Sequence, residues 1–163
     1  MLEPLPIECF PEILNKSSAY DELKSLLDKW GSDKANVHKY HYIYGPIFDI
    51  LPNDLTIMEF GIGTTNKNIA SNMGKKGKPG ASLRAFSEYR PKANIYGADI
   101  DRKIMFEDKN IKTYHVDQTN LLPFQELENN IKNEFHLIID DGLHSPNANL
   151  ATLLYALKKL TPG

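Results

Sequence analysis

The chain has 163 residues, a length that suits a single domain with a sizeable core. Apolar residues make up 41% and charged residues 25% of the sequence, and the net charge of −2 gives no electrostatic sign of a nucleic-acid partner. The single cysteine, Cys9, excludes a disulfide within the chain, and no Cys/His cluster has the spacing of a zinc site.

The sequence has no apolar run long enough to cross a bilayer and no signal-peptide core. We therefore expect a cytoplasmic protein that does not contact membranes. Residues 1–17 are rich in proline and show little periodicity, which predicts an irregular arm. The leucines after Asp21 recur at helical spacing up to Trp30, and Gly31 is expected to end that helix.

A polar loop rich in aromatic residues follows this helix. It begins with Gly31-Ser32-Asp33-Lys34 and continues with His38, Tyr40, Tyr42 and Tyr44. The tyrosines either pack a helix over residues 44–51 onto a sheet or meet a ligand. In the second case the Ser32 hydroxyl and the Lys34 ammonium suit a ligand carboxylate, and the rings suit a ligand cation.

The stretch 56–63 begins with an apolar run after the turn residues 52–54, which predicts a buried parallel strand that leads into a glycine turn. Glu59 would be a buried charge at the end of this strand, so it needs a donor, which a ligand ammonium or hydroxyl would supply. Gly61 and Gly63 let the backbone pass close to a ligand, because neither has a Cβ. In open α/β sheets, this end of the first strand binds nucleotide-like ligands.

The dinucleotide fingerprint Gly-x-Gly-x-x-Gly is incomplete here, because Asn66 stands where the third glycine belongs. Residues 64–80 are polar, basic and glycine-rich rather than helical, which disfavours an NAD site. They predict a solvated flexible loop or, alternatively, a lid over a substrate or a grip on an anionic group. Ser82 is expected to be the N-cap of the next helix.

Two more strands are predicted over 94–98 and 111–116, and polar residues follow each of them. An acidic residue after the second strand of a nucleotide-binding unit takes the ribose hydroxyls. Asp99 lies directly at the strand end and is the better candidate for the ribose hydroxyls. Asp101 is the alternative candidate, or it only caps the next segment. Asp117 either forms a turn or, together with Gln118, faces the ligand.

The remaining elements are a helix around Phe124, a strand over 135–139 and a final helix. The strand is almost wholly apolar, which is typical of the centre of a parallel sheet. It leads into Asp140-Asp141-Gly142-Leu143-His144, after which Ser145 and Pro146 are expected as N-cap and N1. We expect the final helix to bury four leucines, namely Leu150, Leu153, Leu154 and Leu157.

This order of elements predicts an α/β fold with a doubly wound, mainly parallel sheet and one ligand-binding edge. We assign residues 1–30 to an arm and helix and residues 31–163 to a single Rossmann-like domain.

Several of these segments together resemble class I S-adenosylmethionine (SAM) methyltransferases of the macrocin O-methyltransferase type, which methylate sugar hydroxyls. They are Gly31-Ser32-Asp33-Lys34, Glu59-x-Gly61-x-Gly63, Pro79-Gly80-Ala81-Ser82-Leu83-Arg84, Asp99-Ile100-Asp101, Val116-Asp117-Gln118 and Asp140-Asp141-Gly142-x-His144. The resemblance runs from about Gly31 to the C-terminus.

The resemblance implies a role for each matching residue. In the cofactor site, SAM would contact Ser32, Lys34, Glu59, Gly61, Gly63, Asp99, Asp101, Asp117, Gln118 and Asp140. Ser32 and Lys34 would lie near its methionine carboxylate, and Asp117 or Gln118 near its adenine. Asp141 would bind Mg²⁺, and His144 would act as the general base. The alternative, without the resemblance, is that Asp140 and Asp141 form a helix-capping pair and that His144 is a surface residue.

The chemistry agrees with these roles. Methyl transfer to an alcohol needs the attacking oxygen to lose its proton, and histidine is a suitable base for that step. A hard cation held by carboxylates would lower the pKa of the hydroxyl.

In this family Leu-x-Pro-Gly precedes a fifth strand, whereas this chain stops at Leu160-Thr161-Pro162-Gly163. We therefore expect a C-terminally incomplete fold with an open sheet edge. Either the chain is a fragment of a longer protein, or a partner chain such as a second copy covers this edge. We also expect weak Mg²⁺ binding. The leading hypothesis is a SAM-dependent O-methyltransferase acting on a sugar or glycan-type acceptor. The alternatives are a non-catalytic or truncated SAM-binding module and an NAD-binding Rossmann enzyme.

Overall fold

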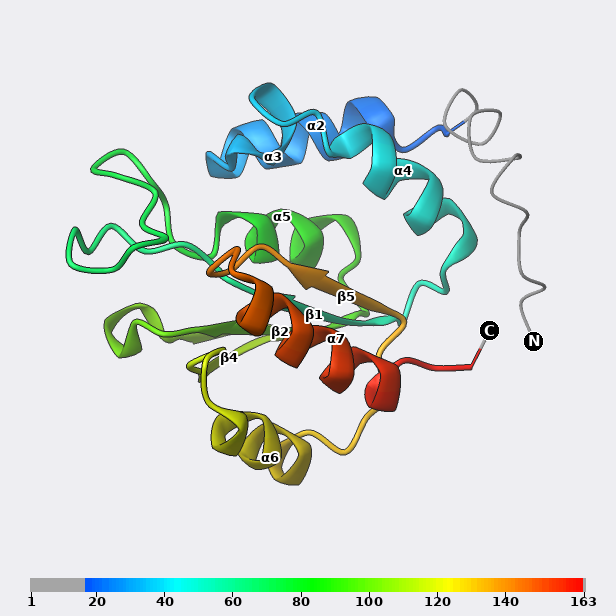
Figure 1. Ribbon diagram of the computed structural model, residues 1–163. Coiled ribbons are helices and arrows are strands. Elements are labelled where there is room, and N and C mark those ends of the chain that lie inside the picture. Colours follow the sequence, from blue (N-terminus) through cyan, green and yellow to red (C-terminus); the bar gives the residue numbers. More distant parts are fainter. Residues whose placement is uncertain (1–16, 163) are drawn as a thin grey trace.

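The computed structural model describes residues 17–162, which form a sheet with helices on both faces (Figure 1). The arm predicted over 1–17 lies, apart from Ser17, outside the described residues. The elements are α2 (Tyr20–Trp30), α3 (Asp33–Asn36), α4 (His41–Ile50), β1 (Thr56–Phe60), α5 (Ala81–Tyr89), β2 (Asn94–Asp99), η2 (Arg102–Ile104), β3 (Glu107–Asp108), β4 (Ile111–His115), α6 (Leu121–Asn130), β5 (Leu137–Asp140) and α7 (Pro146–Lys159).

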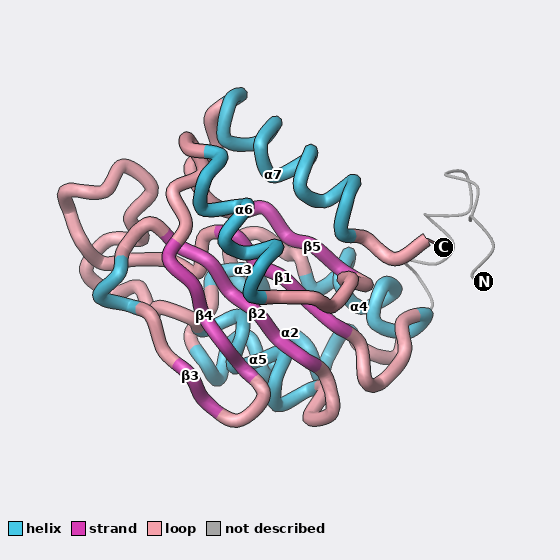
Figure 2. The backbone as a smooth tube through the Cα atoms, turned by 90° about the horizontal axis from the view of Figure 1, so that it is seen from below, coloured by secondary structure: helices cyan, strands magenta, loops and turns pink. Residues whose placement is uncertain are grey.

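The sheet has five strands in the order β3-β4-β2-β1-β5. The four longer strands are parallel, and only the two-residue β3 runs antiparallel to its neighbour β4. Helices α2, α4 and α5 cover one face, and α6 and α7 cover the other, which Figure 2 shows in front of the sheet. The prediction of an α/β fold with a doubly wound, mainly parallel sheet is confirmed.

β1 is buried along its whole length because both faces of the sheet are covered. Successive side chains point to opposite faces. Ile57 joins the core under α2 and α5, while Met58 and Phe60 join the core under α6 and α7. Glu59 therefore lies on the same face as Ile57, towards α5. The register pairs Phe60 with Ala98 and with Asp140, which brings the ends of β1, β2 and β5 together.

One local prediction was wrong, and one short strand was missed. α5 begins at Ala81 after Gly80, whose φ of 71° is left-handed, so Ser82 lies inside the helix and is not its N-cap. β3 was not predicted, because two exposed acidic residues carry no strand pattern. β5 lies at an edge of the described sheet and is half-buried, as the predicted open sheet edge requires, although its apolar sequence is typical of a central strand.

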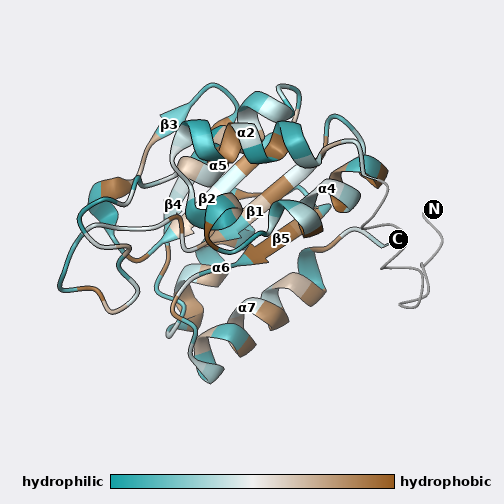
Figure 3. Ribbon diagram, turned by 90° about the horizontal axis from the view of Figure 1, so that it is seen from above, coloured by the Kyte–Doolittle hydropathy of each residue, from teal (hydrophilic) through white to brown (hydrophobic). Residues whose placement is uncertain are grey.

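The buried face of α7 also differs from the prediction. Ser145 accepts a hydrogen bond from the Ala148 N–H, with Pro146 at N1, as expected. However, the residues that face the sheet are Ala148, Thr152, Tyr155 and Ala156. The four leucines expected in the core are instead 51–71% exposed. The apolar stretches on α7 in Figure 3 include this outward stripe. Both stripes have helical spacing, so periodicity alone did not distinguish them.

Matched leucine substitutions test this orientation. Leu153→Ala should change the free energy of unfolding by less than about 0.5 kcal/mol, because the side chain is exposed. Leu127→Ala in α6 should cost about 2–5 kcal/mol, because that leucine is buried. Urea unfolding measures both values. A large loss for Leu153→Ala would show that the outward stripe of α7 is covered in solution.

No helix among residues 17–162 is long and apolar enough to cross a membrane.

Candidate functional site

Two adjoining cavities lie at the carboxyl ends of the parallel strands. The first has a volume of about 350 Å³ and is lined by the 31–40 segment, the β1 turn, the start of α5 and the 141–144 turn. The second has a volume of about 230 Å³ and lies over the ends of β1, β2 and β4. Both cavities are bordered by Gly61, Asp99 and Gly142, so they meet at the tip of β1.

The glycine turn after β1 is required by the protein's own packing. Gly61 has a φ of 80°, and a Cβ there would overlap the backbone of Asp141 and Gly142. Gly63 has a φ of 82°, and a Cβ there would overlap the Met73 side chain. We expected these glycines to make room for a ligand. Both do border the first cavity, but the groups closest to them belong to neighbouring loops.

Gly61→Ala is therefore expected to displace the 141–144 turn. Gly74 is the matched control, because it also has a left-handed φ, 71°, but no atom lies within 4 Å of an added Cβ. Gly74→Ala should lower the free energy of unfolding only by the strain of a left-handed backbone, about 1–2 kcal/mol. Gly61→Ala should cost clearly more, because the clash is with backbone atoms that cannot rotate away. Equal losses in chemical unfolding would contradict the close contact with Asp141.

A buried cation joins two of the predicted site residues. Lys34 is 4% exposed, and its Nζ pairs with Glu59 Oε1 at 3.2 Å and with Asp141 Oδ2. Glu59 is fully buried, and its Oε2 accepts a hydrogen bond from Ser82 Oγ at 2.7 Å. The donor that we expected from a ligand is thus supplied by Lys34 and Ser82.

This arrangement sets the charges in the first cavity. Burial by itself would lower the pKa of Lys34, but the charges of Glu59 and Asp141 outweigh burial and raise that pKa well above its usual value. Burial raises the pKa of Glu59, and the nearby Lys34 and the Ser82 hydrogen bond oppose that rise. Lys34 is therefore charged at neutral pH, and its ammonium holds Asp141 against the end of β1.

Asp99 and Asp101 have different positions, although only one residue separates them. Asp99 borders both cavities, and its carboxylate accepts hydrogen bonds from the N–H groups of Ile62 (3.1 Å) and Asp101 (3.0 Å). Burial raises its pKa, and these backbone hydrogen bonds oppose the rise. The Asp101 carboxylate accepts from Lys103 N–H at 3.0 Å and from Thr64 Oγ1 at 2.6 Å, and it borders neither cavity. Of the two interpretations of Asp101, the structure favours the cap.

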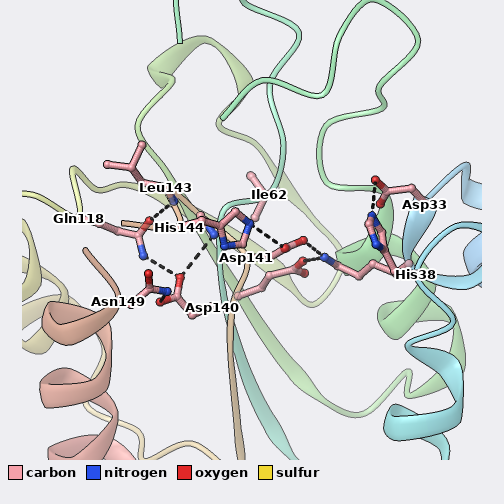
Figure 4. A network of polar contacts seen from close by, with 12 residues as sticks. Asp33, His38, Ile62, Gln118, Asp140, Asp141, Leu143, His144 and Asn149 are labelled. Atoms are coloured by element: carbon pink, nitrogen blue, oxygen red, sulfur yellow. Dashed lines mark hydrogen bonds and ion pairs between the residues drawn. The ribbon is translucent and has the colours of Figure 1, made fainter. Parts of the chain in front are cut away.

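Gln118 organises the turn after β5 (Figure 4). Its Nε2 donates to Asp140 Oδ1 at 2.9 Å and to Thr152 Oγ1 at 2.7 Å, and its Oε1 accepts from Leu143 N–H at 3.0 Å. Asp140 Oδ2 also accepts from Asn149 Nδ2 at 3.0 Å and borders neither of the two cavities. These contacts hold the 140–143 backbone against the second cavity.

Asp117 forms a turn, as one of its two interpretations predicted. Its Oδ1 accepts hydrogen bonds from the N–H and the hydroxyl of Thr119, at 2.9 and 2.6 Å. It also borders the second cavity together with Gln118, so the turn does not remove it from the candidate site.

His144 lies at the rim of the first cavity, beside Asp141 (Figure 4). Its Nε2 is 3.5 Å from Asp141 Oδ1, and its side chain is 63% exposed. Its φ of 54° is left-handed, which is uncommon for a residue other than glycine. Ser32 borders the same cavity and is the N-cap of α3, since its Oγ accepts from Lys34 N–H at 3.4 Å.

The loop 64–80, which the sequence predicts as a flexible loop, a lid or a grip on an anionic group, contributes residues to both cavities. Ser71, Asn72, Met73 and Lys78 border the first cavity, and Asn68 to Ser71 border the second. The loop thus lies against both cavities, as the lid interpretation requires. The sequence does hold a signal that this loop packs against the protein, because Ile69 and Met73 are two large apolar side chains in an otherwise polar loop.

The described residues do not by themselves fit a Mg²⁺ ion. No group of three or more His, Cys, Asp or Glu side chains converges among residues 17–162. Mg²⁺ requires octahedral oxygen coordination. Asp141 provides a carboxylate at the cavity, but that carboxylate is already paired with Lys34.

No protein-family model matches the chain. A curated relative, 8-demethyl-8-alpha-L-rhamnosyl tetracenomycin-C 2'-O-methyltransferase from Streptomyces olivaceus, is 28% identical over 168 residues. The match covers 99% of this chain and 41% of the relative, so the chain spans about two-fifths of the relative's length.

Two solved structures of MycE methyltransferase from the mycinamycin biosynthetic pathway are similar in fold. The complex with Mg and SAH has a TM-score of 0.73 and 23% identity, over 87% of this chain and 37% of that chain. The complex with Mg, SAH and mycinamycin VI has a TM-score of 0.73 and 24% identity, over 87% of this chain and 35% of that chain. These similarities confirm the resemblance to class I SAM-dependent O-methyltransferases of the macrocin type, whose Rossmann-like fold this chain shares.

Proposed function

We propose that this chain binds SAM in the two adjoining cavities and transfers its methyl group to a hydroxyl of a sugar or glycan-type acceptor. The observation that carries the proposal is the pair of cavities at the strand ends, one bordered by charged groups and the other largely by apolar groups. SAM has the same division, with a charged amino-acid end and a flat adenine end. The rhamnosyl 2'-O-methyltransferase named above and the MycE complexes with SAH support the same assignment.

The cavity residues suit the two ends of the cofactor. In the first cavity, Lys34 and Glu59 border the lining and already pair with each other, so the carboxylate and the ammonium of the cofactor would add to this pair. In the second, Ile100, Val116 and Leu143 supply apolar surface for adenine. The ribose links these two ends of SAM, and Asp99 borders both cavities. We therefore assign Asp99 to the ribose and leave Asp101 out of the cofactor contacts.

The chemistry requires a base beside the acceptor hydroxyl. In the transfer, the acceptor oxygen forms a bond to the methyl carbon, the bond from that carbon to sulfur breaks, and neutral SAH is left. The hydroxyl proton goes to the base, for which we assign His144 because it lies at the cavity rim beside Asp141. No step here uses Mg²⁺, since the described residues do not form its site.

A second candidate is a SAM-binding module without turnover. The pairing of Asp141 with Lys34 and the exposure of His144 favour it, because the Asp141 carboxylate already has a cation partner and most of the His144 side chain faces solvent. The NAD-binding alternative has less support, since α5 begins only at Ala81, long after the glycine turn.

Calorimetric titration with SAH tests the cofactor site. We expect one SAH to bind per chain. Leu143→Trp should weaken binding because the larger ring fills the second cavity, whereas Leu150→Trp on the exposed face of α7 should not. A folded protein that binds NADH and not SAH, or neither of them, would overturn the proposal. SAH binding without methyl transfer to any sugar acceptor would favour the second candidate.

A further inference from the structure

Lys78 reaches from the end of loop 64–80 to the turn that joins α2 and α3. A Cβ added at Gly31 would lie 2.7 Å from Lys78 Cδ and 2.9 Å from its Nζ, so the side chain of Lys78 lies against the Gly31 backbone. Lys78 also borders the first cavity, together with Gly31, Ser32 and Lys34. The loop thus places a second lysine in the wall of this cavity, next to the segment that carries Lys34.

The two lysines differ in the charges that already surround them. Lys34 is 4% exposed and pairs with both Glu59 and Asp141, so its single positive charge stands between two carboxylates. A third carboxylate beside Lys34 would meet the repulsion of those two. Lys78 is exposed, and its ammonium forms an ion pair with no carboxylate of residues 17–162. Lys78 is therefore the cavity lysine whose charge no carboxylate of the described chain balances.

The backbone that follows Lys78 is held to the end of the sheet. The Gly80 N–H donates a hydrogen bond to Ile62 O at 2.8 Å, and Arg84 Nη1 donates one to Pro79 O at 3.0 Å. These bonds fix the root of the Lys78 side chain relative to the glycine turn after β1. The ammonium at the other end of its flexible stem is free to meet a ligand.

The amino-acid end of SAM and of SAH carries an ammonium and a carboxylate on the same carbon. The carboxylates that border the first cavity outnumber its lysines, and they belong to Asp33, Glu59, Asp99 and Asp141. This surplus of negative charge suits the ligand's ammonium. The ligand's carboxylate needs a cation that is not already shared with Glu59 and Asp141. A lysine ammonium offers it a full charge and three N–H donors.

We propose that Lys78 binds the carboxylate of the cofactor, a role that the family resemblance assigns to Lys34. This inference rests on the proposed function, because the amino-acid end of SAM must occupy the first cavity. Lys34 then acts within the protein, where it holds Glu59 and Asp141 together at the end of β1. The contact with Lys78 ties the end of loop 64–80 to the bound cofactor.

Calorimetric titration with two ligands tests this contact. SAH carries the carboxylate, and decarboxylated SAH lacks only that group. Lys78→Met should weaken SAH binding about tenfold, because a charge-assisted hydrogen bond is lost, and should leave the affinity for decarboxylated SAH unchanged. Lys78→Arg keeps the charge and should bind SAH nearly as tightly as the wild type does. Lys76→Met is the matched control and should leave both affinities unchanged, because Lys76 is an exposed lysine of the same loop that borders neither cavity.

The outcomes separate this inference from the proposed function. If the wild type does not bind SAH, the proposed function fails. If the wild type binds SAH and Lys78→Met binds it equally well, only the role of Lys78 is overturned. A loss in Lys78→Met that is equal for both ligands would also overturn that role, because the substitution would then disturb the loop and not a carboxylate contact. An equal loss of SAH affinity in Lys76→Met would do the same, because only the net charge of the loop would then matter.

Discussion

Lys34→Met is expected to lower the free energy of unfolding by about 3–5 kcal/mol, because it leaves a buried carboxylate without its cation. Glu59 is fully buried, and in the variant only Ser82 would still donate a hydrogen bond to it. Asp141 would lose the same partner. Lys78→Met is the matched control, because Lys78 borders the same cavity but is exposed, and it should cost less than about 0.5 kcal/mol.

The loss in Lys34→Met should depend on pH. Burial already raises the pKa of Glu59 in the folded protein, and removal of the ammonium would raise it further. A carboxyl group with a raised folded pKa stabilises the folded state below its unfolded pKa, about 4.3, and this contribution is lost as the pH rises through the folded pKa. The stability difference from wild type should therefore be smaller near pH 5 than near pH 8.

The double variant Lys34→Met/Glu59→Gln tests the cause of the loss. A neutral amide at position 59 needs no counter-charge, so it should recover part of the stability lost in Lys34→Met and flatten the pH dependence. Urea unfolding at several pH values measures all of these variants. A small, pH-independent loss in Lys34→Met would mean that the buried ion pair does not organise this end of the sheet.

His144→Ala is expected to lower the rate of methyl transfer by about 10²–10⁴-fold, the usual contribution of a general base. The affinity for SAH should change less than twofold, because His144 lies at the rim of the first cavity with its side chain 63% exposed. Rates at saturating SAM and calorimetric titration with SAH measure the two effects separately.

Two further variants isolate the role of the imidazole. His144→Asn keeps a side chain that tolerates the left-handed φ of 54° but cannot take a proton, so it should be as slow as His144→Ala. His38→Ala removes the other imidazole at this cavity, whose Nε2 is 3.7 Å from Asp33 Oδ2, and should lower the rate less than tenfold. Normal turnover in His144→Asn would assign position 144 a role in backbone geometry and not in proton transfer.

Much of the fold followed from local patterns. The first strand was predicted before Gly61 because an apolar run stands between turn residues and two glycines, and β1 does end at Phe60. The helix ending before Gly31 was predicted because leucine periodicity and a C-terminal glycine agree, and Gly31 does have a left-handed φ of 79°. In both cases the signal lies within a dozen residues of the element that it specifies.

The candidate site was predicted less completely, because its contacts join residues far apart in the chain. The sequence indicated that Glu59 and Asp99 lie at one ligand-binding edge, and both border the first cavity. It did not indicate that Lys34 is the cation for Glu59 and Asp141, since those pairs are separated by 25 and 107 positions. Nor did it indicate that Gln118 holds the turn after β5.

The sequence by itself determined the identity and order of the main strands, the glycine turn and the acidic residues at the strand ends, because hydrophobic period and turn chemistry act over short distances. The tertiary structure alone decided which stripe of α7 is buried, which carboxylates receive a partner and where loop 64–80 lies. Those outcomes depend on how the helices and loops pack on the sheet. The spacing of residues along the chain fits either stripe of α7 and several ion-pair partners equally well, and only packing selects one of them.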